Sequence, residues 1–189
     1  TDEASQGVNR VRETAIFNAA GGTAEVTLSH DGNEFGAVGI TASATELVQS
    51  GTLVLEDMVV ASLTVTADDI TEASGADIVV TGDASLTAVN DGSIVLRSGT
   101  HAFGTLSLTA RDAELSENDG TVLNVVEVDT LTLDVVGDVR DVDDARIEVA
   151  TETDITATGD VTLGDQSGED IQLGEVNITA GVVSISEKD

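Results

Sequence analysis

Short polar side chains recur along this chain in step with an aliphatic residue, at a spacing regular enough to build a ligand-contacting array. One set directly follows the aliphatic residue and consists of Thr41, Thr66, Thr87, Thr109, Asp134, Thr156 and Thr179. A second set directly precedes it and consists of Gly39, Thr64, Ser85, Ser107, Thr132, Asp154 and Asn177. On a flat sheet these sets predict two ranks of hydroxyl groups that hold ordered water or a polar ligand. Threonine is also favoured at exposed strand positions, so a plain solvent-facing sheet is the alternative.

Acidic turns form the second group of candidates, because carboxylate and carbonyl oxygens are the ligands that Ca²⁺ prefers. Stacking such turns brings like charges together, which a cation would relieve. No turn matches the EF-hand loop or a Gly-Gly-x-Gly-x-Asp repeat, so a solvated charged surface is the alternative. Ca²⁺ is the one cofactor the sequence suggests. The residues that would hold it are Asp119, Asp141, Asp143, Asp144, Asp165 and Asp170, the last two bounding one acidic stretch.

Catalytic groupings are missing from the sequence. The two histidines, His30 and His101, share no spacing motif and are interpreted as loop residues. There is no Ser-His-Asp grouping, no phosphate-binding glycine loop and no cysteine, and with three Phe as the only aromatic residues there is no platform for sugars. We therefore predict that the protein is not an enzyme.

The elements that position these residues are indicated by a repeat. The motif is an aliphatic residue, a polar residue and usually alanine, and it begins at Ile40, Val65, Leu86, Leu108, Leu133, Ile155 and Ile178. The mean spacing is (178 − 40)/6 = 23 residues. A period in this range is typical of repeat architectures.

Each period holds three apolar patches separated by turn residues such as Asn90-Asp91-Gly92. Alternating apolar and polar residues predict strands with one buried face. We therefore predict an all-β parallel β-solenoid of about seven to eight rungs, each with 21–25 residues and three strands. Residues 1–22 are expected to form an N-terminal arm or cap with an incomplete first rung, and residues 23–189 the solenoid. A β-sandwich also has alternating strands, but it gives no reason for the motif to recur in phase.

The net charge of −29 restricts the partners of the protein. Such a field repels nucleic acid and anionic membrane surfaces, and it favours cations and high salt. No apolar run reaches the roughly 18 residues of a membrane span, so no membrane insertion is expected. The composition resembles that of proteins from marine or halophilic organisms.

Two stretches carry a resemblance to a known family: Leu106-Ser107-Leu108-Thr109-Ala110 and residues 153–163. They resemble the filamentous-haemagglutinin-type repeats of large secreted bacterial exoproteins. The resemblance implies a right-handed parallel β-helix, secretion, and a surface or adhesive role without catalysis. The chain is also similar to bactofilin-like polymers, which are β-solenoids that stack end to end, and the hydroxyl ranks resemble those of ice-binding β-solenoids.

The expected function is that of a non-enzymatic, extracellular structural or adhesive module of a cell-surface or matrix protein. Its expected partners are itself or neighbouring solenoid modules end to end, surface glycans or cations. Two alternatives stay open. One is a filament subunit that polymerises through strand sequence near its C-terminal end, Val182-Val183-Ser184-Ile185-Ser186, and the other is an ice-binding or Ca²⁺-binding solenoid.

Overall fold

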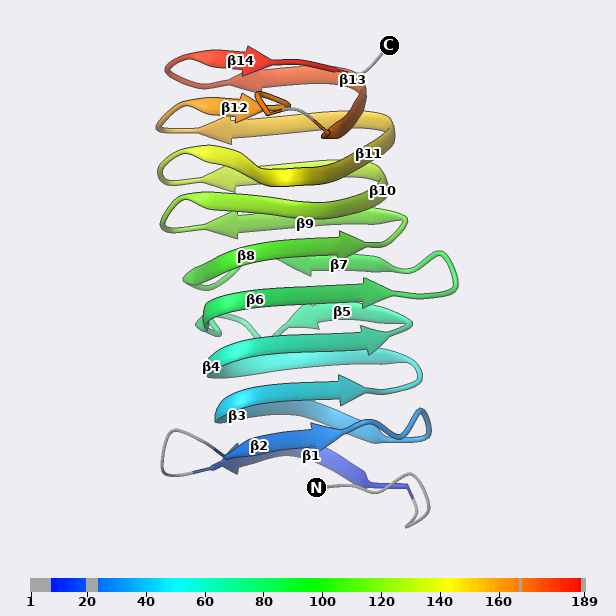
Figure 1. Cartoon of the computed structure of the whole chain (residues 1–189). Helices are drawn as coiled ribbons and strands as arrows, with labels where there is room; N and C mark the ends of the chain where they lie inside the picture. Colours follow the sequence, from blue (N-terminus) through cyan, green and yellow to red (C-terminus); the bar gives the residue numbers. More distant parts are fainter. Residues whose placement is uncertain (1–7, 20–23, 167, 188–189) are drawn as a thin grey trace.

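The structure is a computed structural model that describes residues 8–19, 24–166 and 168–187. Within those ranges it contains strands and no helix, and the strands form one continuous hydrogen-bonded system (Figure 1). The strands are β1 (Arg10–Asn18), β2 (Glu25–Leu28), β3 (Glu34–Val48), β4 (Thr52–Ala67), β5 (Asp69–Glu72), β6 (Ile78–Ala88), β7 (Ser93–Leu96), β8 (His101–Thr109), β9 (Asp112–Glu117), β10 (Thr121–Val135), β11 (Val139–Ala157), β12 (Val161–Leu163), β13 (Asp170–Thr179) and β14 (Val183–Ile185).

The chain winds as a right-handed parallel β-solenoid of about eight turns, which confirms the predicted fold class (Figure 1). Leu86 and Leu108 are direct neighbours in parallel strands. Each turn has three straight segments, and shifts of strand register mark the corners between them. We call the three sides of the rod the first, second and third faces; in one turn they contain Met58, Val65 and Ile70 respectively.

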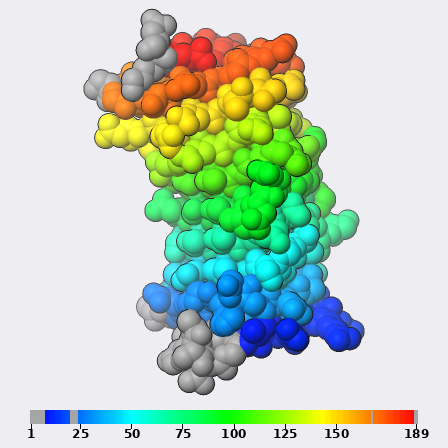
Figure 2. Space-filling view, turned by 90° about the vertical axis from the view of Figure 1, so that its right-hand side faces the viewer, coloured from blue at the N-terminus to red at the C-terminus, as the bar shows by residue number. Residues whose placement is uncertain are grey.

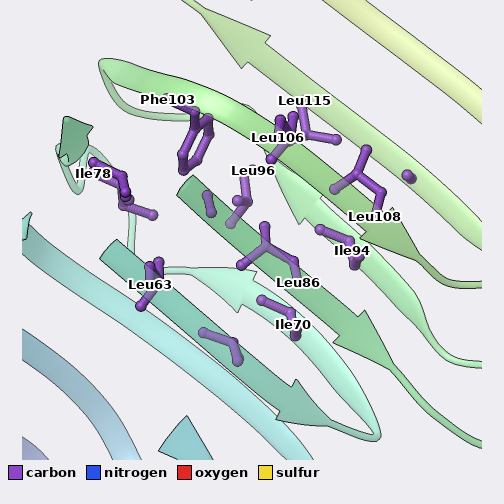
Figure 3. Packing of buried hydrophobic residues seen from close by; sticks show 14 of the residues in the cluster. Leu63, Ile70, Ile78, Leu86, Ile94, Leu96, Phe103, Leu106, Leu108 and Leu115 are labelled. Atoms are coloured by element: carbon purple, nitrogen blue, oxygen red, sulfur yellow. The ribbon is translucent and has the colours of Figure 1, made fainter. Parts of the chain in front are cut away.

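A ladder of aliphatic side chains runs through the rod beneath the second face (Figure 3). Every member is directly paired with the next in parallel register, and all are buried. The ladder consists of Leu28, Leu47, Val65, Leu86, Leu108, Val126, Ile147 and Ile171. Burying one such side chain stabilises the fold by about 1.5–3 kcal/mol, so this ladder contributes substantially to a core that also extends beneath the other two faces.

Replacing Leu86 by alanine is expected to lower the free energy of unfolding by about 2–5 kcal/mol. Leu86 is fully buried, and Val65 and Leu108 lie directly below and above it in paired strands that cannot collapse into the gap. Urea denaturation measures the change. Its matched control is Thr87→Ala, which truncates the outward-facing neighbour and should change the stability by less than about 0.5 kcal/mol. If the two substitutions lowered the stability equally, the assignment of Leu86 to the buried ladder would be wrong.

The repeated motif does not keep to one face, so the prediction of a single in-phase column is wrong. Val65, Leu86 and Leu108 do stack on one another beneath the second face. Ile40 instead lies below Met58, beneath the first face. The remaining three, Leu133, Ile155 and Ile178, stack together beneath the third face.

Variation in turn length explains this shift from face to face. Along the ladder, the sequence position rises by only 65 − 47 = 18 in the shortest turn and by 171 − 147 = 24 in the longest. The predicted rung length of about 21–25 residues, which follows from the repeat period, is therefore wrong at its lower limit. The motif at Ile40 is followed by the next one 25 residues later, and so is the motif at Leu108. One full turn of the solenoid at either place contains only 18 residues. The excess, 25 − 18 = 7, carries the motif past one corner and onto the next face.

The turn at Val89–Gly92 shows how tightly successive turns stack. Asn90 and Asp91 both have positive φ, and the N–H of Gly92 donates to the carbonyl oxygen of Val89 at 3.0 Å, as in a type I′ turn. A Cβ on Gly92 would lie 1.6 Å from the carbonyl oxygen of Asp68 in the turn below. Only glycine allows this approach, and the predicted turn at residues 90–92 is confirmed.

The winding begins within residues 1–22, the segment expected to form an arm or cap with an incomplete first rung. Strand β1 pairs in parallel with β3, so residues 10–18 are part of the winding. Residues 1–7 and 20–22 of that segment lie outside the described residues. No helix among the described residues is long and apolar enough to cross a membrane.

Candidate functional site

The predicted hydroxyl column is divided between faces. Thr66, Thr87 and Thr109 are consecutive neighbours on the second face. Thr156 and Thr179 are neighbours on the third face, where they continue from Asp134. Thr41 is paired with Val59 and has no threonine above it. The six residues therefore do not form one array.

What remains on the second face is a compact hydroxyl patch of two ranks. Its first rank is Thr64, Ser85 and Ser107, and its second is Thr66, Thr87 and Thr109. Paired strands repeat about every 4.8 Å, so three turns place six hydroxyl groups on a regular grid. This patch can donate and accept hydrogen bonds with water or with a polar ligand. Ice binding by it stays a prediction that thermal hysteresis would test.

Several aspartates at the corners accept a hydrogen bond from a backbone N–H in the following turn of the solenoid. At the corner between the third and first faces, the N–H of Asp77 donates to Asp57 Oδ1 at 3.0 Å. One turn further on, the N–H of Thr100 donates to Asp77 Oδ1 at 2.9 Å. An aspartate here accepts the backbone N–H that would otherwise lack a partner at the bend.

The same arrangement recurs near the C-terminal end of the rod. The N–H of Asp160 donates to Asp138 Oδ1 at 2.9 Å, and the N–H of Val182 donates to Asp160 Oδ1 at 2.8 Å. These carboxylates therefore explain part of the acidic composition without any metal ion. Asp119 is exposed in the turn after β9 and is not brought near the other predicted ligands.

Two of the predicted metal ligands do meet, and a third carboxylate joins them. One oxygen each from Asp141, Asp165 and Glu169 lies within 4.8 Å of the other two. We call these three residues the acidic cluster. Asp141 comes from β11, and the other two come from residues 164–169, which connect β12 to β13 in the turn above. Glu169 lies inside the acidic stretch noted in the sequence, but nothing in the sequence singled it out.

The environment of the acidic cluster disfavours ionised carboxyl groups. Burial raises the pKa of Asp141, and the charge of Asp165 raises it further. Burial likewise raises the pKa of Glu169, and Asp141, Asp165 and Asp143 add to the effect. Asp144 lies beside Gly168, whereas Asp170 lies near Arg146 and is not a member of the cluster.

Two further carboxylates are buried inside the rod, and the sequence analysis missed both. Glu72 Oε2 lies 2.5 Å from His101 Nε2, and its Oε1 accepts the backbone N–H of Arg97 at 2.5 Å and that of Ser98. The interpretation of His101 as a loop residue is wrong: it stacks on Ile78 beneath the first face and is fully buried. His30 does lie in a loop, where its carbonyl oxygen accepts the N–H of Asn33 at 3.0 Å.

Glu117 is the second buried carboxylate. It continues the inward alternation of Ala113 and Leu115 in β9, and this two-residue periodicity is the signal that could have revealed it. Burial raises the pKa of Glu117 to about 8, and Asp119 contributes to the rise. The Thr121 hydroxyl and the backbone N–H of Phe103 lower that pKa in part, although neither makes a well-aligned hydrogen bond.

The winding, the stacked ladders and the polar corners define the class of protein as a parallel β-solenoid repeat protein. The chain belongs to the family described as repeats of unknown function (DUF5649), whose model matches residues 42–110 and again residues 110–186. Each match therefore spans roughly three of the 18–24-residue turns. No curated protein and no solved structure was found to match the chain.

Proposed function

We propose that the protein is a non-enzymatic, extracellular structural and adhesive module of a cell-surface or matrix protein. The observation that carries this proposal is the continuous rod itself (Figures 1 and 2), which has about eight turns. One apolar core runs through it, and polar residues alternate with the core residues along the strands. At about 4.8 Å per turn, its length is roughly 35–40 Å. A rigid rod of this kind separates neighbouring modules and presents its flat faces to binding partners such as surface glycans.

The outer surface supports this proposal. Arginines bridge the acidic side chains of successive turns, as where Arg97 Nη1 lies 3.0 Å from Glu114 Oε2 and its Nη2 lies 3.8 Å from Asp134 Oδ2. These pairs offset only part of a net charge of −29, so the rod stays strongly anionic. The resemblance of residues 106–110 and 153–163 to filamentous-haemagglutinin-type repeats suggests secretion and adhesion.

Labelling of intact cells tests this function. Antibodies raised against the purified domain should label non-permeabilised cells that carry the native protein, and brief protease treatment of the intact cells should remove the signal. The control is an antibody against a cytoplasmic protein, which should label cells only after permeabilisation. Labelling that appears only after permeabilisation would overturn the extracellular assignment.

End-to-end polymerisation is a second candidate function, because the C-terminal turn exposes residues that point toward the core. Val176 and Val183 are paired with Thr153 and Val161 of the turn below, and both partners are fully buried. Val176 and Val183 are 44% and 46% exposed. Among the described strands, β13 and β14 pair only with the turn below, so no strand covers their outer edges, although Glu187 Oε1 accepts the N–H of Leu173 at 3.0 Å.

A second copy of the chain fits this end. Its strand β1 pairs only with β3 among the described strands and runs in the same sense along the coil, so stacking on its other edge would continue the winding.

Sedimentation and electron microscopy test this candidate. The parent should form rods whose length grows with concentration, because each added copy continues the same parallel pairing. The double variant Val176→Lys/Val183→Lys places like charges on the end and should remain a single short rod. Single short rods of the parent at every concentration would rule polymerisation out.

A further inference from the structure

The acidic cluster contains an unsatisfied buried group that its protein neighbours do not explain. Glu169 is only 8% exposed, and its Oε1 has no hydrogen-bond partner. Asp141 Oδ1 is likewise buried without a partner. The other oxygen of each is satisfied: Asp141 Oδ2 accepts the N–H of Gly164 at 2.8 Å, and Glu169 Oε2 accepts the N–H of Gln166 at 2.8 Å.

These two unpartnered oxygens belong to residues of the same cluster, in which repulsion between carboxylates is not offset. Within the described parts of the chain, no arginine, lysine or histidine forms an ion pair with Asp141, Asp165 or Glu169. A buried charge without a partner costs several kcal/mol, so proteins pair such groups or use them to coordinate metals. The carboxylates are held together by the fold, in the absence of any attraction between them.

The distances fit a hard divalent cation. Oxygen ligands bind Ca²⁺ at about 2.3–2.6 Å, so two ligands on opposite sides of one ion are separated by about 4.6–5.2 Å. The three oxygens lie within 4.8 Å of one another, close enough for one such ion to contact all of them. All three groups are carboxylates, which suits Ca²⁺ and does not suit the softer metals that nitrogen and sulfur ligands select.

The cluster is also open to solvent on one side. Asp141 and Asp165 line a hollow of about 330 Å³ in which two further aspartates, Asp138 and Asp160, outnumber the single cation, Arg140. An ion can enter through this hollow and keep water molecules in its remaining coordination positions. Ca²⁺ accepts six to eight oxygens in flexible geometry, whereas Mg²⁺ demands a smaller and nearly ideal octahedron.

We propose that Asp141, Asp165 and Glu169 bind one Ca²⁺ ion, which fastens the connection between β12 and β13 to the turn below. Asp141 is part of β11, so the ion links Asp165, which follows β12, and Glu169, which precedes β13, to the body of the rod. The ion satisfies the buried oxygens of Asp141 and Glu169, and it neutralises part of the local negative charge. Its consequence is a more stable C-terminal end.

Isothermal titration of the chelator-treated protein with CaCl₂, at constant ionic strength, tests the proposal. We expect saturable binding of about one Ca²⁺ per chain, with weaker binding of Mg²⁺. At Ca²⁺ a hundredfold above the dissociation constant, the melting temperature should rise by roughly 5–10 °C over that in chelator. Glu169→Gln and, separately, Asp165→Asn should weaken binding at least tenfold and remove the rise.

The matched control is Glu175→Gln, which removes one exposed carboxylate from β13 outside the cluster and should leave Ca²⁺ binding within twofold of the parent. Asp165 is exposed, so Asp165→Asn tests the site even if Glu169→Gln disturbs folding. Absence of saturable binding up to millimolar Ca²⁺ would overturn the proposal. So would equal binding of Mg²⁺, or binding that all three variants retain, which would indicate diffuse attraction to the acidic surface.

Discussion

Replacing His101 by leucine is expected to lower the free energy of unfolding by about 3 kcal/mol, because it leaves a buried carboxylate without its side-chain partner. Leucine keeps the apolar volume against Ile78 and Phe103, so the loss comes mainly from Glu72. The Glu72 side chain is 5% exposed, and its Oε2 would face the core without the imidazole that now lies 2.5 Å away.

A double-mutant cycle distinguishes this effect from simple loss of packing. Adding Glu72→Gln to His101→Leu should recover most of the lost stability, because a neutral amide is less costly to bury than a carboxylate. Its side-chain oxygen can still accept the backbone N–H groups of Arg97 and Ser98. The measurement is urea denaturation of the parent, both single variants and the double variant at neutral pH. Additive losses would show that the two side chains do not depend on each other.

Replacing Glu117 by glutamine is expected to stabilise the protein at high pH, by an amount on the order of 4 kcal/mol above pH 8. Burial raises the pKa of Glu117 from 4.5 to about 8 in the folded protein. Between these two values the folded state holds the proton more tightly than the unfolded chain does. The stability that this group contributes is therefore complete below pH 4.5 and is lost as the pH rises toward 8.

The difference in unfolding free energy between Glu117→Gln and the parent should consequently grow from pH 4.5 to 8 and then level off. The parent has a net charge of −29, and the variant differs from it by one carboxyl group. The general effect of net charge on stability therefore cancels in this difference. The control is Glu114→Gln in the same strand, whose side chain is 42% exposed and pairs with Arg97 at the surface. It should change stability by less than about 1 kcal/mol. A difference that does not vary with pH would refute the assignment for Glu117.

The sequence indicated the architecture well because the solenoid depends on local patterns. Alternation of apolar and polar residues predicts strands, and a period of about 23 residues predicts stacked turns. The pairing of Leu86 with Leu108 and the turn at Asn90-Asp91-Gly92 are confirmed on this basis. The candidate ligands were anticipated only in part: Asp141 and Asp165 do meet, whereas Asp119 lies elsewhere and Glu169 was not singled out.

By itself, then, the sequence determined that this chain forms a parallel β-solenoid with an aliphatic core and an acidic surface. Only the tertiary structure decided on which face each motif lies and which carboxylates point inward. The reason is that all three faces share the same two-residue alternation, so an 18-residue turn and a 24-residue turn look alike locally. Neighbours across turns depend on the sum of all preceding turn lengths. Because of that sum, the predicted threonines lie on different faces, and Glu169 lies close to Asp141.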